Sequence, residues 1–226
     1  KTYSGTNYFT LSVGNFSTIW DGGGSNNNWG TASNWVGDTT PANDGSGLII
    51  FANNPGTRTN PFVNTAWNVQ GIRFTNGMTS SYRLAGQTIT IGFGGVNNNS
   101  ATAQYISNNM VYSSDSSVRG NNADMYMLGQ QDFGDHKINV GGNSNTYFQG
   151  NIVGTGTIRK TNGGSLYING VDSSLGGLLT LGGTTIVNGA NVTIQNVDGN
   201  AVLSNTSTFI MNGVNMDVDR IFSSNA

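Results

Sequence analysis

The sequence contains no cysteine and no glutamate, and it carries few charges. Nine Lys and Arg residues stand against eleven Asp in 226 residues, for a formal net charge of −2. Without thiols, neither a disulfide framework nor a zinc–thiolate site is available. Nine cations scattered along the chain do not predict the clustered basic face that binds phosphate backbones, so we expect no nucleic acid partner.

Long apolar runs are also missing. The longest, over residues 48–52, is far shorter than the roughly 20 apolar residues of a membrane-spanning helix, so we expect no transmembrane segment. Helix-forming residues are scarce, which excludes a helical bundle. The chain begins with Lys1, which fits a mature secreted protein whose leader was removed, or equally an excised fragment.

Glycine and asparagine are abundant instead, with 34 of each, and both suit turns and left-handed backbone conformations. Between them, apolar and polar residues alternate in short runs that end at Gly or Asn. Such runs lie at residues 71–74, 88–91, 137–140, 165–168, 178–181, 185–187, 191–194 and 208–211. A period of two predicts a short β-strand with one buried face, and the chain is therefore predicted to be all-β.

Many short strands with Gly and Asn corners fit two architectures. One is an antiparallel β-sandwich, and the other is a parallel β-solenoid (β-helix), in which the strands of one coil pair with those of the next. The corners favour the solenoid, because they are denser than the strands of a sandwich require and because asparagine amides can stack from coil to coil. We therefore predict one solenoid domain over residues 17–226, with the sandwich as the alternative.

Several segments follow one another in the order found in a known group of bacterial proteins. They include WDGGG at residues 20–24, NWGTASNW at 28–35, LIIF at 48–51, GIRFTN at 71–76 and GNIVGTGTIRKTNGGSLYING at 150–170. In this order they resemble the proteins that carry autotransporter-associated β-strand repeats, over about residues 20–189. The resemblance implies a secreted, right-handed β-helix of the passenger type, used at cell surfaces for adhesion or extracellular structure.

Acid–base groups are densest at residues 132–137. Asp132, Asp135 and His136 could flank a glycosidic bond in a polysaccharide-degrading enzyme. Adjacent residues on a strand point to opposite faces, however, so sequence neighbours make poor catalytic partners. We favour the alternative, a solvated loop before the strand at 137–140. No spacing matches an EF-hand loop or another calcium-binding repeat, and we expect neither a metal nor a cofactor.

Three of the four tryptophans, Trp20, Trp29 and Trp35, lie close together near the N-terminus. Exposed indole faces stack on sugars, which would make this segment a glycan-binding site. The alternative is a hydrophobic plug, because the first coil has no preceding coil to cover its core and large rings bury much apolar area. We favour the plug.

Residues 1–16 precede these motifs and are predicted to form an N-terminal extension strand. Phe9, Leu11 and Val13 share one face of it. The terminal coils of a solenoid present unpaired N–H and C=O groups and uncovered apolar side chains, an edge that must be capped or paired. The strand could dock on the end of another copy and build a filament head to tail, or fold back as a cap on its own first coil.

These features together predict a non-enzymatic structural protein, extracellular or at the cell surface, whose main partner is another copy of itself. Assembly would use the solenoid ends and the strand that carries Phe9. The alternative is a glycan-binding adhesin module that uses the three tryptophans. A polysaccharide-degrading β-helix enzyme is the third and least favoured interpretation.

Overall fold

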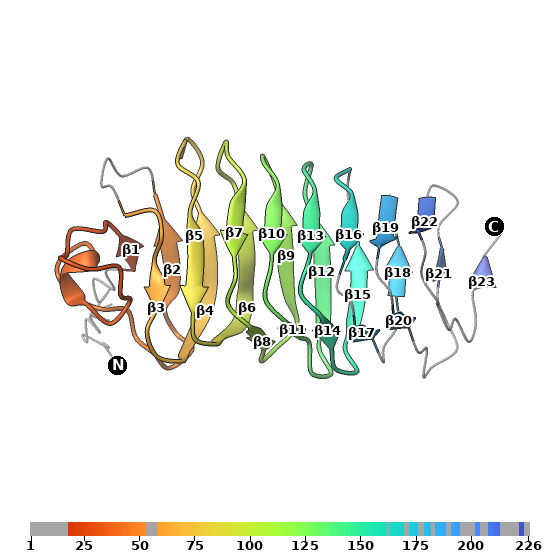
Figure 1. Cartoon of the computed structure of the whole chain (residues 1–226), viewed down its shortest axis with the longest axis horizontal. Helices are drawn as coiled ribbons and strands as arrows, with labels where there is room; N and C mark the ends of the chain where they lie inside the picture. Colours follow the sequence, from red (N-terminus) through yellow and green to blue (C-terminus); the bar gives the residue numbers. More distant parts are fainter. Residues whose placement is uncertain are drawn as a thin grey trace, which may run out of the picture.

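The computed structural model describes residues 18–52, 58–161 and 163–169, together with the backbone of seven strands between Asp172 and Ser223. Within these residues the chain is built of short strands, and the one helical element is a single 3-10 turn, η1 (Ala32–Asn34). Figure 1 shows the strands following one another along the long axis of the molecule, from the N-terminal to the C-terminal end.

Most strands belong to a 13-stranded sheet. Its main path comprises β1 (Ile19–Trp20), β2 (Leu48–Phe51), β4 (Trp67–Phe74), β6 (Ile89–Asn98), β9 (Ser116–Gly120), β12 (Lys137–Gly141), β15 (Thr157–Lys160), β18 (Leu179–Leu181), β21 (Val202–Leu203) and β23 (Phe222–Ser223). Three further strands join this sheet off the main path, namely β8 (Met110–Tyr112), β11 (Gln131–Asp132) and β14 (Ile152–Val153).

An 8-stranded sheet lies in front of the 13-stranded sheet in Figure 1. It comprises β3 (Phe62–Val63), β5 (Arg83–Gly86), β7 (Gln104–Ile106), β10 (Met125–Met127), β13 (Thr146–Phe148), β16 (Leu166–Ile168), β19 (Thr184–Asn188) and β22 (Thr208–Asn212). The remaining strands, β17 (Asp172–Leu175) and β20 (Asn191–Ile194), pair with each other.

All ladders between the described strands are parallel, and a strand pairs with its counterparts in the preceding and following coils. The hydrogen bonds of Asn145 with Ser165 and of Ser116 with Gly92 join residues 20 and 24 positions apart, which is about the length of one coil. This connectivity confirms the predicted parallel β-solenoid and makes the antiparallel sandwich wrong. Its right-handed sense stays a prediction. Within the described residues, antiparallel pairing is confined to one isolated bridge, between Trp20 and Trp35.

Alternation along each strand places one face inside the solenoid. In β10, Met125 and Met127 are buried, whereas Tyr126 between them is partly exposed. The parallel register repeats this pattern from coil to coil, so that Ile106, Met127 and Phe148 form one buried column. Each further coil extends the same buried core. It adds to the stability of the fold, because apolar surface removed from water contributes about 25 cal/mol per Å².

Asparagine and aspartate side chains join the coils at the corners. Asp115 accepts a hydrogen bond from the backbone N–H of Lys137, one coil later, at 2.9 Å. Asn145 accepts one from the backbone N–H of Ser165 at the same distance. Such contacts satisfy backbone donors where the strand ladder stops, and an unpaired buried donor would cost free energy. They give the abundant asparagine a structural role.

Candidate functional site

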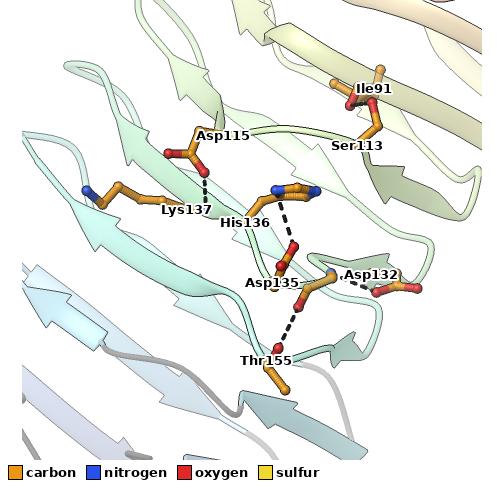
Figure 2. Close-up of polar contacts among 9 residues, drawn as sticks. Ile91, Ser113, Asp115, Asp132, Asp135, His136, Lys137 and Thr155 are labelled. Carbon is orange, nitrogen blue, oxygen red and sulfur yellow. Dashed lines mark hydrogen bonds and ion pairs between the residues drawn. The ribbon is translucent and has the colours of Figure 1, made fainter. Parts of the chain in front are cut away.

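The acid–base cluster at residues 132–137 forms the turn between β11 and β12. The Oδ1 atom of Asp132 accepts a hydrogen bond from the backbone N–H of Gly134 at 2.9 Å, and Phe133 is buried in the core. Gly134 has a positive φ of 55°, and its carbonyl accepts a hydrogen bond from the backbone N–H of Thr155 in the next coil. Figure 2 shows the contact of Asp132 and, at Thr155, a second hydrogen bond, in which the side-chain hydroxyl donates to the same carbonyl at 3.3 Å. The Asp132 carboxylate therefore closes the turn.

Asp135 and His136 lie at the surface of the same turn. The Nδ1 atom of His136 is 3.5 Å from Oδ1 of Asp135, and the two side chains are 30% and 84% exposed, respectively. Exposed ion pairs of this kind contribute little free energy. The structure thus brings Asp135 and His136 together but gives Asp132 a different partner. This arrangement fits the solvated loop better than a pair of carboxylates that flank a glycosidic bond.

The three clustered tryptophans are fully buried. The ring centroids of Trp20 and Trp35 are 5.2 Å apart with nearly perpendicular planes, and those of Trp29 and Trp35 are 5.8 Å apart. The Nε1 atom of Trp35 donates a hydrogen bond to the carbonyl of Trp29 at 2.7 Å. No ring face is left for a sugar, which contradicts the glycan-binding interpretation of Trp20, Trp29 and Trp35. Instead, the rings cover the core of the first coil.

The segment over residues 21–36, which we call the N-terminal cap, covers the first strand of both sheets. On β1, the backbone N–H of Val36 donates to the carbonyl of Ile19 at 2.9 Å. On β3, the N–H of Trp29 donates to the carbonyl of Phe62, also at 2.9 Å. These are the groups that an added strand would need. The first coil is therefore covered by its own chain and is not a bare end.

The predicted assembly residues Phe9, Leu11 and Val13 lie outside the described residues. The division of the chain into an extension at 1–16 and a solenoid at 17–226 stays a prediction for the same reason. The first described strand, β1, begins at Ile19.

A stack of tyrosines runs along the outer face of the 8-stranded sheet, and sequence reasoning missed it. Tyr105, Tyr126, Tyr147 and Tyr167 are register partners in successive strands. Their successive ring centroids are 4.8, 4.3 and 4.4 Å apart, and the interplanar angles are 13° or less. The guanidinium carbon of Arg83 lies 4.0 Å from the centroid of the Tyr105 ring and covers one end of the stack. We call these four rings the tyrosine ladder.

The stacking leaves the ring edges, and not the ring faces, for contact with solvent. Desolvation, helped by the neighbouring hydroxyl of Tyr147 and the carboxylate of Asp124, raises the pKa of Tyr126 to about 12. Desolvation also raises the pKa of Tyr147. Tyr126 and Tyr147 each have a neighbouring ring on both faces, so neither offers a free ring face for a sugar.

A weak signal for the ladder was present in the sequence. Tyrosine recurs about every 21 residues, each time between two residues that the solenoid buries. The neighbours are apolar in Met125–Met127 and Leu166–Ile168. In Gln104–Ile106 and Thr146–Phe148, a polar residue replaces one of them and obscures the repeat.

The parallel β-solenoid is the class of protein that this fold defines. No protein-family model matches the chain, and no curated protein or solved structure matches it. The resemblance to autotransporter-associated repeats therefore rests on the sequence segments themselves. Among the described residues, no helix is long and apolar enough to cross a membrane. In the same part of the chain, no cluster of three or more metal-binding side chains occurs.

Proposed function

We propose that this chain is a non-enzymatic structural protein, located outside the cell or at its surface, that assembles head to tail with copies of itself. The observation that supports the proposal is a difference between the two ends of the sheets. At the N-terminal end, β1 and β3 are hydrogen-bonded to the N-terminal cap. At the other end of the sheets, the described strands give β23 one partner, β21, and β22 one partner, β19.

A strand edge with free N–H and C=O groups accepts a further strand. The segment that contains Phe9, Leu11 and Val13 has the alternation of such a strand, with three apolar side chains to set against the core of a neighbouring copy. Because the N-terminal cap occupies the first edge of both sheets, the accepting edge in this proposal is the far one. Such a contact joins two different surfaces, and contacts of this type build filaments when they do not close into a ring.

The regular interior of the solenoid supports a structural role. Neighbouring coils are joined by parallel ladders, by corner contacts such as Asn145 with Ser165, and by the tyrosine ladder. In such a chain each coil contacts only its neighbours, and every further coil adds the same kind of interface. The extracellular location rests on the resemblance to the passenger-type β-helices.

Negative-stain electron microscopy of the purified chain over a range of concentrations tests the proposal. We expect filaments from the intact chain and separate particles from a chain that lacks residues 1–16. The triple variant Phe9→Ser, Leu11→Ser and Val13→Ser should behave like the deletion. The matched control, Thr10→Ala with Ser12→Ala, changes the other face of the same predicted strand and should still form filaments.

Two outcomes would count against the proposal. Filaments that persist in the deletion variant would remove residues 1–16 from the contact. Separate particles of the intact chain at every concentration would end the self-assembly proposal as a whole.

A further inference from the structure

The outer face of the 13-stranded sheet carries three arginines that the sequence alone did not bring together. Arg73 in β4 and Arg159 in β15 are exposed, and Arg119 in β9 is partly exposed, each between buried neighbours. The three arginine side chains therefore project from the same face of the sheet. Within the described part of the chain, none of the three forms an ion pair. The face is thus cationic and not neutralised.

Register places two of these arginines on either side of one asparagine. Asn97 in β6 is the partner of Arg73 on one side and of Arg119 on the other. Two strand spacings separate the arginines, which puts their Cα atoms roughly 10 Å apart along the solenoid axis. Arg159 lies two coils after Arg119 but two residues away from this row, because its partner Asn139 pairs with Ser117, whereas Arg119 pairs with Gly141. Asp115, just before β9, is a nearby carboxylate, and it accepts a hydrogen bond from the backbone of Lys137.

A bulge in β6 exposes an aromatic ring beside this row. The register of β4 and β6 shifts between Val69 and Gly71, so that residues 92–94 lie opposite Gln70. Phe93, at the centre of this bulge, is 71% exposed. Gly95 has a φ of 63°, and a Cβ atom there would lie 2.2 Å from the carbonyl oxygen of Ser117. The bulge therefore requires glycine, and bulges of this kind often redirect a side chain at a functional site.

One hydrogen bond ties the bulge to the arginine row. The Nδ2 atom of Asn97 donates to the carbonyl of Gly94, the residue after Phe93, at 3.0 Å. An exposed phenylalanine by itself is common on protein surfaces. Here Phe93 lies four residues before Asn97 on β6, and the bulge that carries it is bonded to Asn97, whose register partners are the two arginines. We call Phe93, Arg73, Asn97 and Arg119 the arginine–bulge site.

We propose that the arginine–bulge site binds an acidic sugar unit of a linear polysaccharide. A guanidinium group presents two parallel N–H donors, which match a carboxylate. The ring of Phe93 offers an apolar face to the C–H side of the sugar ring. Arg159 is the next arginine along the solenoid axis, in a row two residues away, and a longer polysaccharide that crosses between the two rows reaches it. This function goes beyond the structural role and does not depend on self-assembly.

Titration of the full chain with polygalacturonate, followed by calorimetry, tests this site. We expect Arg73→Gln and Arg119→Gln each to weaken binding about tenfold, as loss of a charge-assisted contact would. Phe93→Ala should weaken it about fivefold through loss of the ring contact. The matched controls, Arg83→Gln and Phe62→Ala, remove the same groups from the 8-stranded sheet and should leave the affinity unchanged.

Neutral dextran and duplex DNA complete the comparison. The proposal expects no binding of dextran, and it expects Phe93→Ala to weaken the binding of polygalacturonate more than that of DNA. An intact chain that does not bind polygalacturonate overturns the proposal. Equal losses in the site variants and the controls would also overturn it, since they would indicate attraction to overall charge. Filament formation, measured on the same variants, should not change, so the two proposals fail separately.

Discussion

The N-terminal cap and the repeated coils solve the same problem in different ways. In the coils, each buried column is covered by its counterparts in the coils before and after, and side chains of moderate size such as Ile106 and Met127 suffice. Among the described residues, no coil precedes the first one. There the chain folds back irregularly and fills the end with Trp20, Trp29 and Trp35. The comparison teaches that, at this end, large rings supply contacts that a neighbouring coil supplies elsewhere.

Asparagine shows the same contrast. Asn34 in the cap is fully buried and bonds within its own segment, donating to the carbonyls of Asn26 and Asn28 and accepting from the N–H of Gly24. Asn145 in the coils is partly exposed and bonds to the next coil. Asparagine therefore stabilises a loop at the end of the solenoid and joins neighbouring coils in its middle.

Removal of a ring from the cap should give the largest effect. We expect Trp35→Ala to lower the free energy of unfolding by about 3–5 kcal/mol, because it leaves a cavity among the other rings. Denaturant unfolding measures the change. Val36→Ala is the control, since this neighbour is 44% exposed; its cost should stay below about 0.5 kcal/mol. Equal losses in both variants would show that Trp35 does not seal the core.

Loss of an asparagine should cost more in the cap than at a corner. Asn34→Ala removes the hydrogen bonds made by a fully buried side chain and leaves the backbone N–H of the buried Gly24 without this partner, so it should lower the unfolding free energy by about 2–3 kcal/mol. Asn145→Ala breaks two partly buried hydrogen bonds, one from the N–H of Ser165 and one to the hydroxyl of Tyr147, and should cost about 1 kcal/mol. Thermal unfolding of the two variants side by side ranks them. The reverse order would contradict the division of roles between cap and coils.

The smallest effect should belong to the tyrosine ladder, and it should depend on pH. The folded-state pKa of Tyr126, about 12, lies above the ordinary tyrosine value of 10. The protonated phenol therefore contributes stability that is complete below pH 10 and is lost as the pH rises through 12. Tyr126→Phe should make the alkaline decline in unfolding free energy shallower. If the unfolding free energy of the variant declines as steeply with pH as that of the intact chain, the ionisation of Tyr126 does not cause the decline.

Much of the fold follows from local patterns. The alternation at residues 137–140 and 165–168 predicts strands that the structure has as β12 and β16. The plug interpretation of Trp20, Trp29 and Trp35 also followed from one general point, that a first coil lacks cover. Burial and strand pattern depend on neighbours in sequence, and such features can be inferred without a structure.

The candidate sites are predicted less well by the sequence. Composition indicated scattered cations, yet the coil register sets Arg73 and Arg119 on either side of Asn97. Asp132 and His136 are close in sequence, yet the turn gives them different partners. Proximity along the chain was a poor guide because a coil of 20 to 24 residues brings distant residues together and turns adjacent ones apart.

The amino-acid sequence by itself determined that the chain forms short strands with one buried face and tight corners, because alternation and turn-forming residues act over a few positions. Only the tertiary structure decided which residues stand side by side on the outer faces. That choice depends on the length of every coil and on the register of every ladder. A change of one residue in either would move Tyr126 out of its stack and Arg73 out of its row.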